Sequence, residues 1–377
     1  MRNHNNQIAA LAVVLVLAAA APGMSQIIYG QPTSADLRVI YSHWSQKNDS
    51  GTTSINQWVI PITGLVPLKD NLEMRFYAAN ASNSLEDGAS EYRLSGFSDV
   101  RLQVNSSLAN DRILLSAGFN LPTGKKELSR ETERPVMAVL TENYLGLPIR
   151  GLGEGMGVNL LVGMAAAAGN SRMGASIMYQ YNGAYKAYEG EADYKPGDMF
   201  SVNVGGDTKA GEFTLGGGVT YSTYTTDKVD ERKVFKQSDQ IDLHVGGNYK
   251  TGACRFLADI RYLIRGRNTR YDPDQAIDYR LKVYGNELAF AGGVTWTPRP
   301  AWSVTPMVEL RLIDGNEFDD QRKIGPSNNL GMGIEVGRTI MNNVDLGVGF
   351  KYYTGSADNG NIDLSGYRLS AGLTAAF

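Results

Sequence analysis

The sequence predicts an all-β fold, a transmembrane antiparallel up-and-down β-barrel of about sixteen strands (roughly fourteen to eighteen) after a cleaved signal peptide. Three observations predict it. Apolar residues alternate with small or polar ones, the links between strands are alternately short and long, and the apolar N-terminal run is short. The mean hydropathy of −0.25 fits this fold, because a barrel carries its apolar surface in alternation rather than in long runs.

The N-terminal segment predicts export from the cytoplasm. An apolar run over residues 8–21 is followed by the small residues Gly23 and Ser25, which suit cleavage by signal peptidase. We therefore expect a signal peptide over residues 1–25 and a mature barrel over residues 26–377. The alternative, a single membrane anchor, is disfavoured because the run is shorter than the ~20 apolar residues that span a bilayer.

The C-terminal segment alternates most strictly. One face of this strand is apolar, and the opposite face is small or polar. The first face carries Tyr367, Leu369, Ala371, Leu373, Ala375 and Phe377, and the second carries Gly366, Arg368, Ser370, Gly372, Thr374 and Ala376. The terminal Phe377 resembles the C-terminal signature of Gram-negative outer-membrane barrels. That resemblance implies an outer-membrane location, with lipid and the barrel assembly machinery as partners.

The links between strands define the topology. Seven short links have Gly, Pro, Asn or Asp turn chemistry and lie at residues 67–70, 109–111, 169–171, 209–211, 250–252, 298–300 and 340–343. Eight longer ones are expected around residues 48–54, 80–96, 122–153, 182–197, 223–238, 266–285, 314–327 and 354–363. Short periplasmic turns and long extracellular loops are typical of outer-membrane barrels. A secreted β-sandwich would also alternate, but it gives no reason for this asymmetry.

The inner face should collect the charged residues of the strands, because a charge facing lipid at the midplane costs roughly 2 to 4 kcal/mol. The candidates that line the lumen are Arg38, Glu73, Arg75, Arg101, Asp242, His244, Asp259, Arg261, Glu287, Glu309, Arg311, Glu335, Asp345, Lys351 and Arg368. These residues either select among permeating solutes by charge or act as counter-ions to one another in a water-filled lumen. Their balance of signs argues against a strongly anion- or cation-selective pore.

The segment 122–153 is the longest predicted connection. It begins with a charged run and becomes apolar over residues 136–140 and 144–149, which is unusual for an extracellular loop. A long loop of this kind is usually functional, and burial of its apolar half requires it to fold into the barrel or against a neighbour. The constriction-loop candidates are Lys125, Lys126, Arg130 and Glu131. A surface flap or an oligomer contact is the alternative.

Three stretches resemble a known family. They are the Gly-x-x-Asp strand over residues 96–102, the strand over residues 114–124 that ends in Leu-Pro-Thr-Gly, and the Gly-rich return over residues 151–155 with the hairpin 160–181. In this order they resemble the MetA-pathway-of-phenol-degradation type of outer-membrane transporter. The resemblance implies a channel for small, often hydrophobic or aromatic compounds. Hydrophobic-compound channels carry an N-terminal hatch, whereas about ten residues precede the first strand here.

Other functions have weaker support. After signal removal the histidines are His43 and His244, the latter near Asp259, and neither lies in a catalytic motif. We expect no enzyme activity, no cofactor, no metal site and no nucleic-acid partner, given a net charge of −3 and no metal-ligand spacing. The expected function is an outer-membrane channel for diffusion of small solutes, as a monomer or a homo-oligomer. A non-transporting structural or partner-binding barrel is the alternative.

Overall fold

The computed structural model describes residues 32–272, 277–317 and 323–377, so the predicted signal peptide lies outside the described residues. The main sheet contains β1 (Ser34–Asn48), β2 (Gly51–Lys69), β3 (Leu72–Asp87), β4 (Ser90–Phe97), β5 (Val100–Leu108), β6 (Ile113–Leu121), β7 (Gly157–Ala168), β8 (Ser171–Asn182), β10 (Met199–Ala210), β11 (Phe213–Tyr224), β14 (Gln240–Thr251), β15 (Cys254–Arg265), β18 (Glu287–Arg299), β19 (Trp302–Ile313), β22 (Ser327–Met341), β23 (Val344–Ala357) and β24 (Ile362–Ala376).

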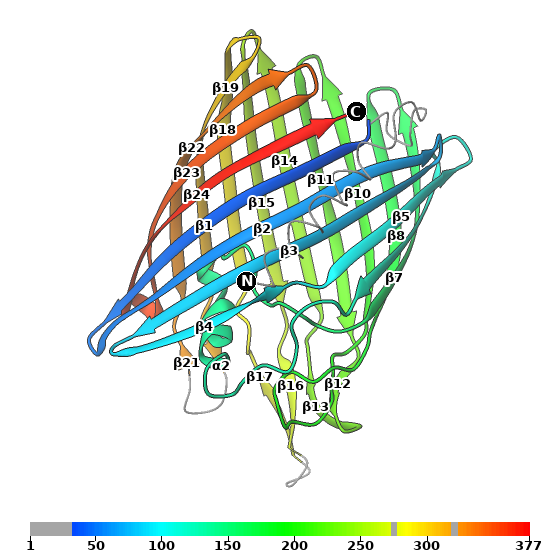
Figure 1. Ribbon diagram of the computed structural model, residues 1–377. Coiled ribbons are helices and arrows are strands. Elements are labelled where there is room, and N and C mark those ends of the chain that lie inside the picture. The colour runs from blue at the N-terminus through cyan, green and yellow to red at the C-terminus, as the bar shows by residue number, and fades with distance from the viewer. Residues whose placement is uncertain (1–31, 273–276, 318–322) are drawn as a thin grey trace, which may run out of the picture.

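These strands form a closed antiparallel barrel. Each strand pairs with the next one along the chain, and β1 pairs with β24, which closes the sheet. Because β4 and β5 pair one after the other with β3, the seventeen strands fill sixteen positions, as predicted. The predicted short links are all tight turns at one end of the barrel, together with the C-terminus (Figure 1). We call this the turn end, and the opposite end the loop end.

The two faces of the sheet differ as a membrane barrel requires. The outward positions expose large apolar side chains, such as Leu160 at 56% and Val245 at 54% exposure. The inward positions carry the charged side chains, and they alternate strictly with the outward ones along each ladder. A row of exposed apolar side chains around a closed sheet is stable only against lipid, so the fold is that of a membrane-spanning barrel.

Three of the predicted long loops are instead strand. The regions around residues 48–54, 80–96 and 354–363 form hairpins that continue the ladders β1–β2, β3–β4 and β23–β24, with the short 3₁₀ helix η2 (Asp358–Gly360) in the last. Their outward residues are polar, for example Ser82 and Ser95, whose hydroxyls lie 2.9 Å apart. The prediction was wrong because the ladder continues where the outward face no longer needs to be apolar.

The other loops carry small elements at the loop end (Figure 1). The connection between β6 and β7 holds the helix α2 (Arg134–Leu140) and the 3₁₀ helix η1 (Asn143–Leu145). Five short strands form a separate sheet from three loops: β9 (Tyr194–Lys195), β12 (Thr226–Val229), β13 (Arg232–Lys236), β16 (Asn268–Asp272) and β17 (Ile277–Leu281). A further pair is β20 (Asn316–Glu317) with β21 (Lys323–Ile324). Among the described residues, no helix is long and apolar enough to span a bilayer.

Candidate functional site

All fifteen charged candidates lie on the inward face. The registers place Arg38 opposite Gly372, Lys351 opposite Arg368, and Asp345 opposite Thr374. Arg75 of β3 is opposite Gln103, and on the other side of the barrel His244 of β14 is opposite Arg261. The same face carries the side chains that contact the loop between β6 and β7, which identifies it as the interior.

The inward charges around β14, β15, β18 and β19 are arranged in rows across the strands. A basic row contains His244, Arg261 and, past Ala289, Arg311. The next inward row toward the loop end is acidic, with Asp242 and Glu287 on either side of Leu263. One step toward the turn end lies a second acidic row with Asp207, Asp259 and Glu309, separated by glycine and alanine. The lumen therefore carries bands of alternating sign.

Several inward charges form ion pairs, either with the adjacent strand, across one intervening strand, or within a strand. The single Nε–H of Arg261 makes a bifurcated hydrogen bond to the carboxylate of Asp242, with Nε 2.9 Å from each oxygen. Arg311 lies 3.2 Å from Glu287, and Lys351 pairs with Glu309. Arg75 lies 2.9 Å from Glu73 on its own strand, and Arg38 lies 3.3 Å from Asp36. Much of the inner wall therefore consists of mutual counter-ions, which stabilise cross-strand pairing.

Other inward candidates have different partners. Arg101 lies over the ring of Tyr77, 6.0 Å from its centroid. Asp345 accepts a hydrogen bond of 2.6 Å from the hydroxyl of Thr339. Within the described ranges, the carboxylates of Asp259 and Glu335 make no hydrogen bond or ion pair, and none joins His244 to Asp259. The register sets Asp259 opposite Gly246 rather than opposite His244.

The segment between β6 and β7 runs across the inward face at the loop end. Helix α2 begins with Pro135 in its first turn, where the missing N–H costs nothing, and buries Val136 and Leu140 on one face. The following η1 ends at Gly146, whose φ of 57° suits glycine. We call residues 122–153 the crossing loop.

The crossing loop is hydrogen-bonded to inward side chains of five strands, among them Gln46 of β1, which accepts from the hydroxyl of Tyr144 at 3.1 Å. Arg311 of β19 donates to the carbonyl of Asn143 at 2.7 Å, and Asn329 of β22 donates to that of Tyr144 at 2.8 Å. Arg368 of β24 donates to the carbonyl of Gly146 at 2.7 Å. Gln57 of β2 bonds both backbone groups of Ile149, at 2.7 and 3.1 Å. The loop leaves the wall between β6 and β7 and reaches side chains as far round as β19.

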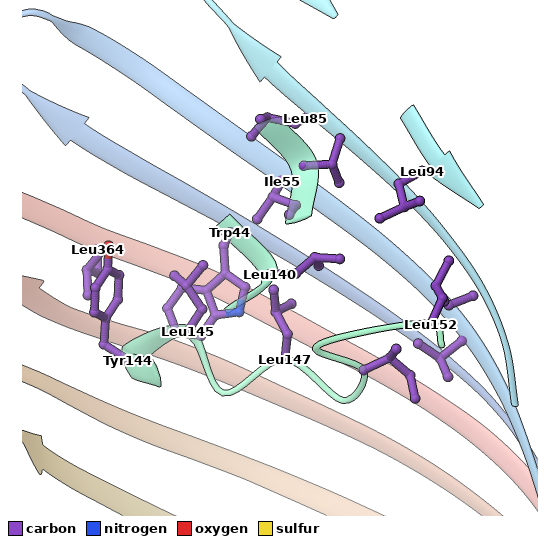
Figure 2. Close-up of a cluster of buried hydrophobic side chains, with 14 of the residues drawn as sticks. Trp44, Ile55, Leu85, Leu94, Leu140, Tyr144, Leu145, Leu147, Leu152 and Leu364 are labelled. Atoms are coloured by element: carbon purple, nitrogen blue, oxygen red, sulfur yellow. The ribbon is translucent and has the colours of Figure 1, made fainter. Parts of the chain in front are cut away.

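A hydrophobic cluster fixes the crossing loop to the wall (Figure 2). Trp44 of β1 is buried and stacks on Tyr353 of β23, with ring centroids 5.1 Å apart. Leu140, Leu145 and other apolar side chains of the loop pack in the same cluster. Burial of apolar surface contributes about 25 cal/mol per Å², so this cluster stabilises the loop on the wall in addition to its hydrogen bonds.

Both ends of the crossing loop meet at Asp99, which lies in the break between β4 and β5 and is 5% exposed. Its Oδ1 accepts from the N–H of Gly124 at 2.8 Å. Its Oδ2 accepts from the N–H of Glu154 at 2.7 Å and from the side chain of Asn120 at 2.9 Å. We call these four residues the Asp99 clamp. The three stretches that carry the family resemblance therefore meet at one carboxylate.

Of the charged run of the crossing loop, Lys125 lies against the inward Gly96 of β4, and its N–H donates to the carbonyl of Phe97 at 3.1 Å. The charged groups of the run find their partners in the loops. Lys125 pairs with Glu133 within the loop, and Arg130 lies 2.5 Å from Glu191 in the connection between β8 and β10. Lys126 and Glu131 are exposed. The other wall contacts come from the apolar half, mainly through backbone carbonyls that carry no sequence signal. Sequence reasoning selected the apolar residues 144–149 for burial, but it named the charged residues as the constriction candidates and missed the backbone carbonyls that the wall binds.

Buried ionisable groups accompany the crossing loop and its neighbours. Burial raises the pKa of Glu142, and burial followed by repulsion from Arg311 lowers the pKa of Arg150. In the small loop sheet, burial raises the pKa of Asp227, although its carboxylate accepts hydrogen bonds from Tyr194 at 2.5 Å and from the N–H of Gly197 at 2.7 Å.

The remaining polar candidates show no catalytic arrangement. His43 faces outward, and its Nδ1 lies 2.8 Å from Oδ1 of Asn56, which also accepts from Tyr41. No cluster of three or more potential metal ligands occurs in the described ranges. Phe377 is 49% exposed, and its N–H donates to the carbonyl of Thr33 at 2.8 Å.

Comparison with known proteins finds similarity at the level of solved structures. No protein-family model matches the chain, and no curated protein matches it in sequence. The outer membrane protein OprD from Pseudomonas aeruginosa is 11% identical, with 94% of this chain and 98% of that chain covered and a TM-score of 0.47. A FadL homologue from the same organism is 10% identical, with 93% and 91% covered and a TM-score of 0.46. The translocator domain of the autotransporter NalP from Neisseria meningitidis is 8% identical, with 100% and 98% covered and a TM-score of 0.36.

Proposed function

We propose that the protein is an outer-membrane channel through which small solutes diffuse. A closed barrel with an apolar outer face and a charged, partly solvated inner face supports this proposal. The inner face includes His244 and Asp259, which are exposed to solvent inside the barrel. A lumen that solvates charged side chains can admit polar solutes.

One observation carries the proposal. The crossing loop is held across the interior by Gln57, Asn329, Arg311 and Arg368, which lie on four different strands. A loop tied to the inside of a barrel narrows the passage and leaves the wall intact, which is an arrangement expected of a solute channel. A barrel with a purely structural role does not require a loop fixed across its interior.

The family resemblance extends the proposal to the solute and the location. It suggests small hydrophobic or aromatic compounds as cargo and the outer membrane of a Gram-negative bacterium as the site. The exposed Phe377 at the end of β24 is then the residue recognised by the barrel assembly machinery. The bands of alternating charge suggest that any preference between anions and cations is mild.

Conductance in a planar bilayer tests the proposal. Residues 26–377 are refolded and compared with a variant in which residues 126–151 are replaced by two glycines. This join is feasible because a Cβ on Gly153 would lie 2.7 Å from the carbonyl oxygen of Lys125, so the two loop ends are adjacent. We expect stable steps in the parent and larger steps in the variant. Silence in both folded barrels would refute the open channel and favour the structural barrel.

A further inference from the structure

The inner wall contains a hollow of about 570 Å³ on its turn-end side. Its floor consists of small residues on neighbouring strands, among them Gly246, Ala291 and Gly293. Leu257 and Met307 supply apolar side chains at its edge, and Asp259 supplies a carboxylate. The hollow lies apart from the crossing loop, none of whose residues line it.

The carboxylate of Asp259 lies over the bare backbone of Gly246. A Cβ on Gly246 would lie 2.8 Å from Oδ2 of Asp259, so glycine leaves the room that this carboxylate uses. On the other side, Asp259 is opposite Ala291, which is also too small to shield it. The carboxylate therefore projects into the hollow beside apolar surface.

Asp259 differs from the other acidic residues of its row. Asp207 accepts a hydrogen bond of 3.0 Å from Arg172, and Glu309 pairs with Lys351. The guanidinium of Arg261, two residues from Asp259, is directed to Asp242. In the part of the chain that the structure describes, Asp259 has neither a hydrogen bond nor an ion pair. Arg261 attracts Asp259 only at longer range, and Arg172, which also lines the hollow, is hydrogen-bonded to Asp207. The hollow thus presents one carboxylate without a direct cationic partner in the described ranges.

We propose that this hollow binds a small organic cation, with its ammonium group at Asp259 and its apolar body against Leu257 and Met307. The inference rests on the proposed channel function and names a class of solute for it. An ammonium donor to a carboxylate makes a charge-assisted hydrogen bond, which is about twice as strong as a neutral one. The adjacent apolar surface favours an organic cation over Na⁺ or K⁺, because only a cation with a hydrocarbon body buries apolar surface there.

Blockade of the channel current tests the proposal with three probes of similar shape. Benzylammonium, benzyl alcohol and benzoate share an aromatic ring and differ in charge. We expect benzylammonium to reduce the current of the parent at concentrations at which the other two do not. Asp259→Asn should weaken this block by about tenfold, since it removes the charge and keeps the shape.

Glu335→Gln is the matched control. Glu335 is also an inward carboxylate without an ion pair in the described ranges, but it does not line the hollow. The two variants change the charge of the lumen equally, so a local site predicts a loss of block in Asp259→Asn alone. Equal weakening in both variants, or undiminished block in Asp259→Asn, would overturn the proposal.

Calorimetric titration of benzylammonium into the refolded barrel in detergent separates this inference from the channel function. If the barrel passes current but binds benzylammonium no better than benzyl alcohol, the binding site is refuted and the channel stands. If the barrel is silent in bilayers, binding that depends on Asp259 still supports the site. Absence of such binding refutes it.

Discussion

The substitution Asp99→Asn should loosen the crossing loop at its two ends without changing the shape of the side chain. In the native clamp, each carboxylate oxygen accepts a backbone N–H, from Gly124 at 2.8 Å and from Glu154 at 2.7 Å. An asparagine keeps one acceptor oxygen and replaces the other by an NH₂ group. Whichever way the amide is turned, one backbone N–H then faces a donor.

The size of the effect follows from the burial of the clamp. Asp99 is 5% exposed, so water cannot fully replace the lost acceptor. A hydrogen bond to a charged group contributes about 1.5 to 3 kcal/mol, which corresponds to a change of about 10- to 150-fold in the local opening equilibrium. The contacts of the loop with β19, β22 and β24 are untouched, so the whole loop should not detach.

Amide hydrogen exchange of the refolded barrel measures this opening directly. We expect the protection of peptides containing Gly124 or Glu154 to fall by the stated factor in Asp99→Asn. Ser98→Ala is the matched control, because its hydroxyl accepts from the N–H of Ala79 at 3.1 Å and donates to the carbonyl of Asp99 at 3.4 Å, both outside the crossing loop. That variant should leave the protection of the loop ends unchanged.

Two results would refute the reasoning about the clamp. Unchanged protection in Asp99→Asn would mean that the loop ends are held by something other than this carboxylate. An equal loss of protection in Ser98→Ala would mean that the break between β4 and β5, rather than the carboxylate, controls the loop. Heat-modifiable migration in gels establishes beforehand that each variant is folded.

Three further predictions concern the loop and its surroundings. Trp44→Ala removes a buried ring and should destabilise the barrel by about 3 to 5 kcal/mol in urea unfolding, whereas Trp58→Ala, at an outward site 52% exposed, should cost less. Gly124→Ala should release the loop as Asp99→Asn does, because its Cβ would lie 2.1 Å from the carbonyl oxygen of Leu152. Unchanged hydrogen-exchange protection of the loop ends in Gly124→Ala would contradict this. Burial raises the pKa of Asp227, so the Asp227 carboxyl binds a proton more tightly in the folded loop sheet than in the unfolded chain. The hydrogen-exchange protection of the loop sheet should therefore fall as the pH rises from the ordinary pKa of 3.8 through the raised pKa. Asp227→Asn should flatten this pH dependence.

The face of each strand could be predicted from the sequence because side chains alternate with a period of two residues. Lipid demands an apolar residue at every second position, and this demand is strong in the later strands, such as β23 and β24. It disappears beyond the membrane, where β3 continues with outward serines although its ladder with β4 is unbroken. The strand count was therefore correct while the ends of three hairpins were not.

The crossing loop was identified by its length and its apolar half, but its points of contact were not. Charged residues such as Lys125 and Arg130 attract attention in a sequence, yet they bind partners within the loops. The wall binds backbone carbonyls of residues 143–146, and any residue type supplies a carbonyl. The clamp at Asp99 did carry a signal, since its residues lie in the Gly-x-x-Asp, Leu-Pro-Thr-Gly and Gly-rich stretches that stand out in the sequence.

The banding of charge in the lumen depends on register, and register is a long-range property. Alternation determines that Asp259 and Arg261 both face inward, but it does not determine which residues of β14 and β18 lie beside them. A shift of two residues in one pairing would keep every side chain on its face and would place Asp259 beside Arg311 instead of Glu309 in the row. The hollow at Asp259 would then hold a compensated carboxylate, with no preference for a cation. The proposed selectivity therefore depends on the stagger of the strands as much as on their composition.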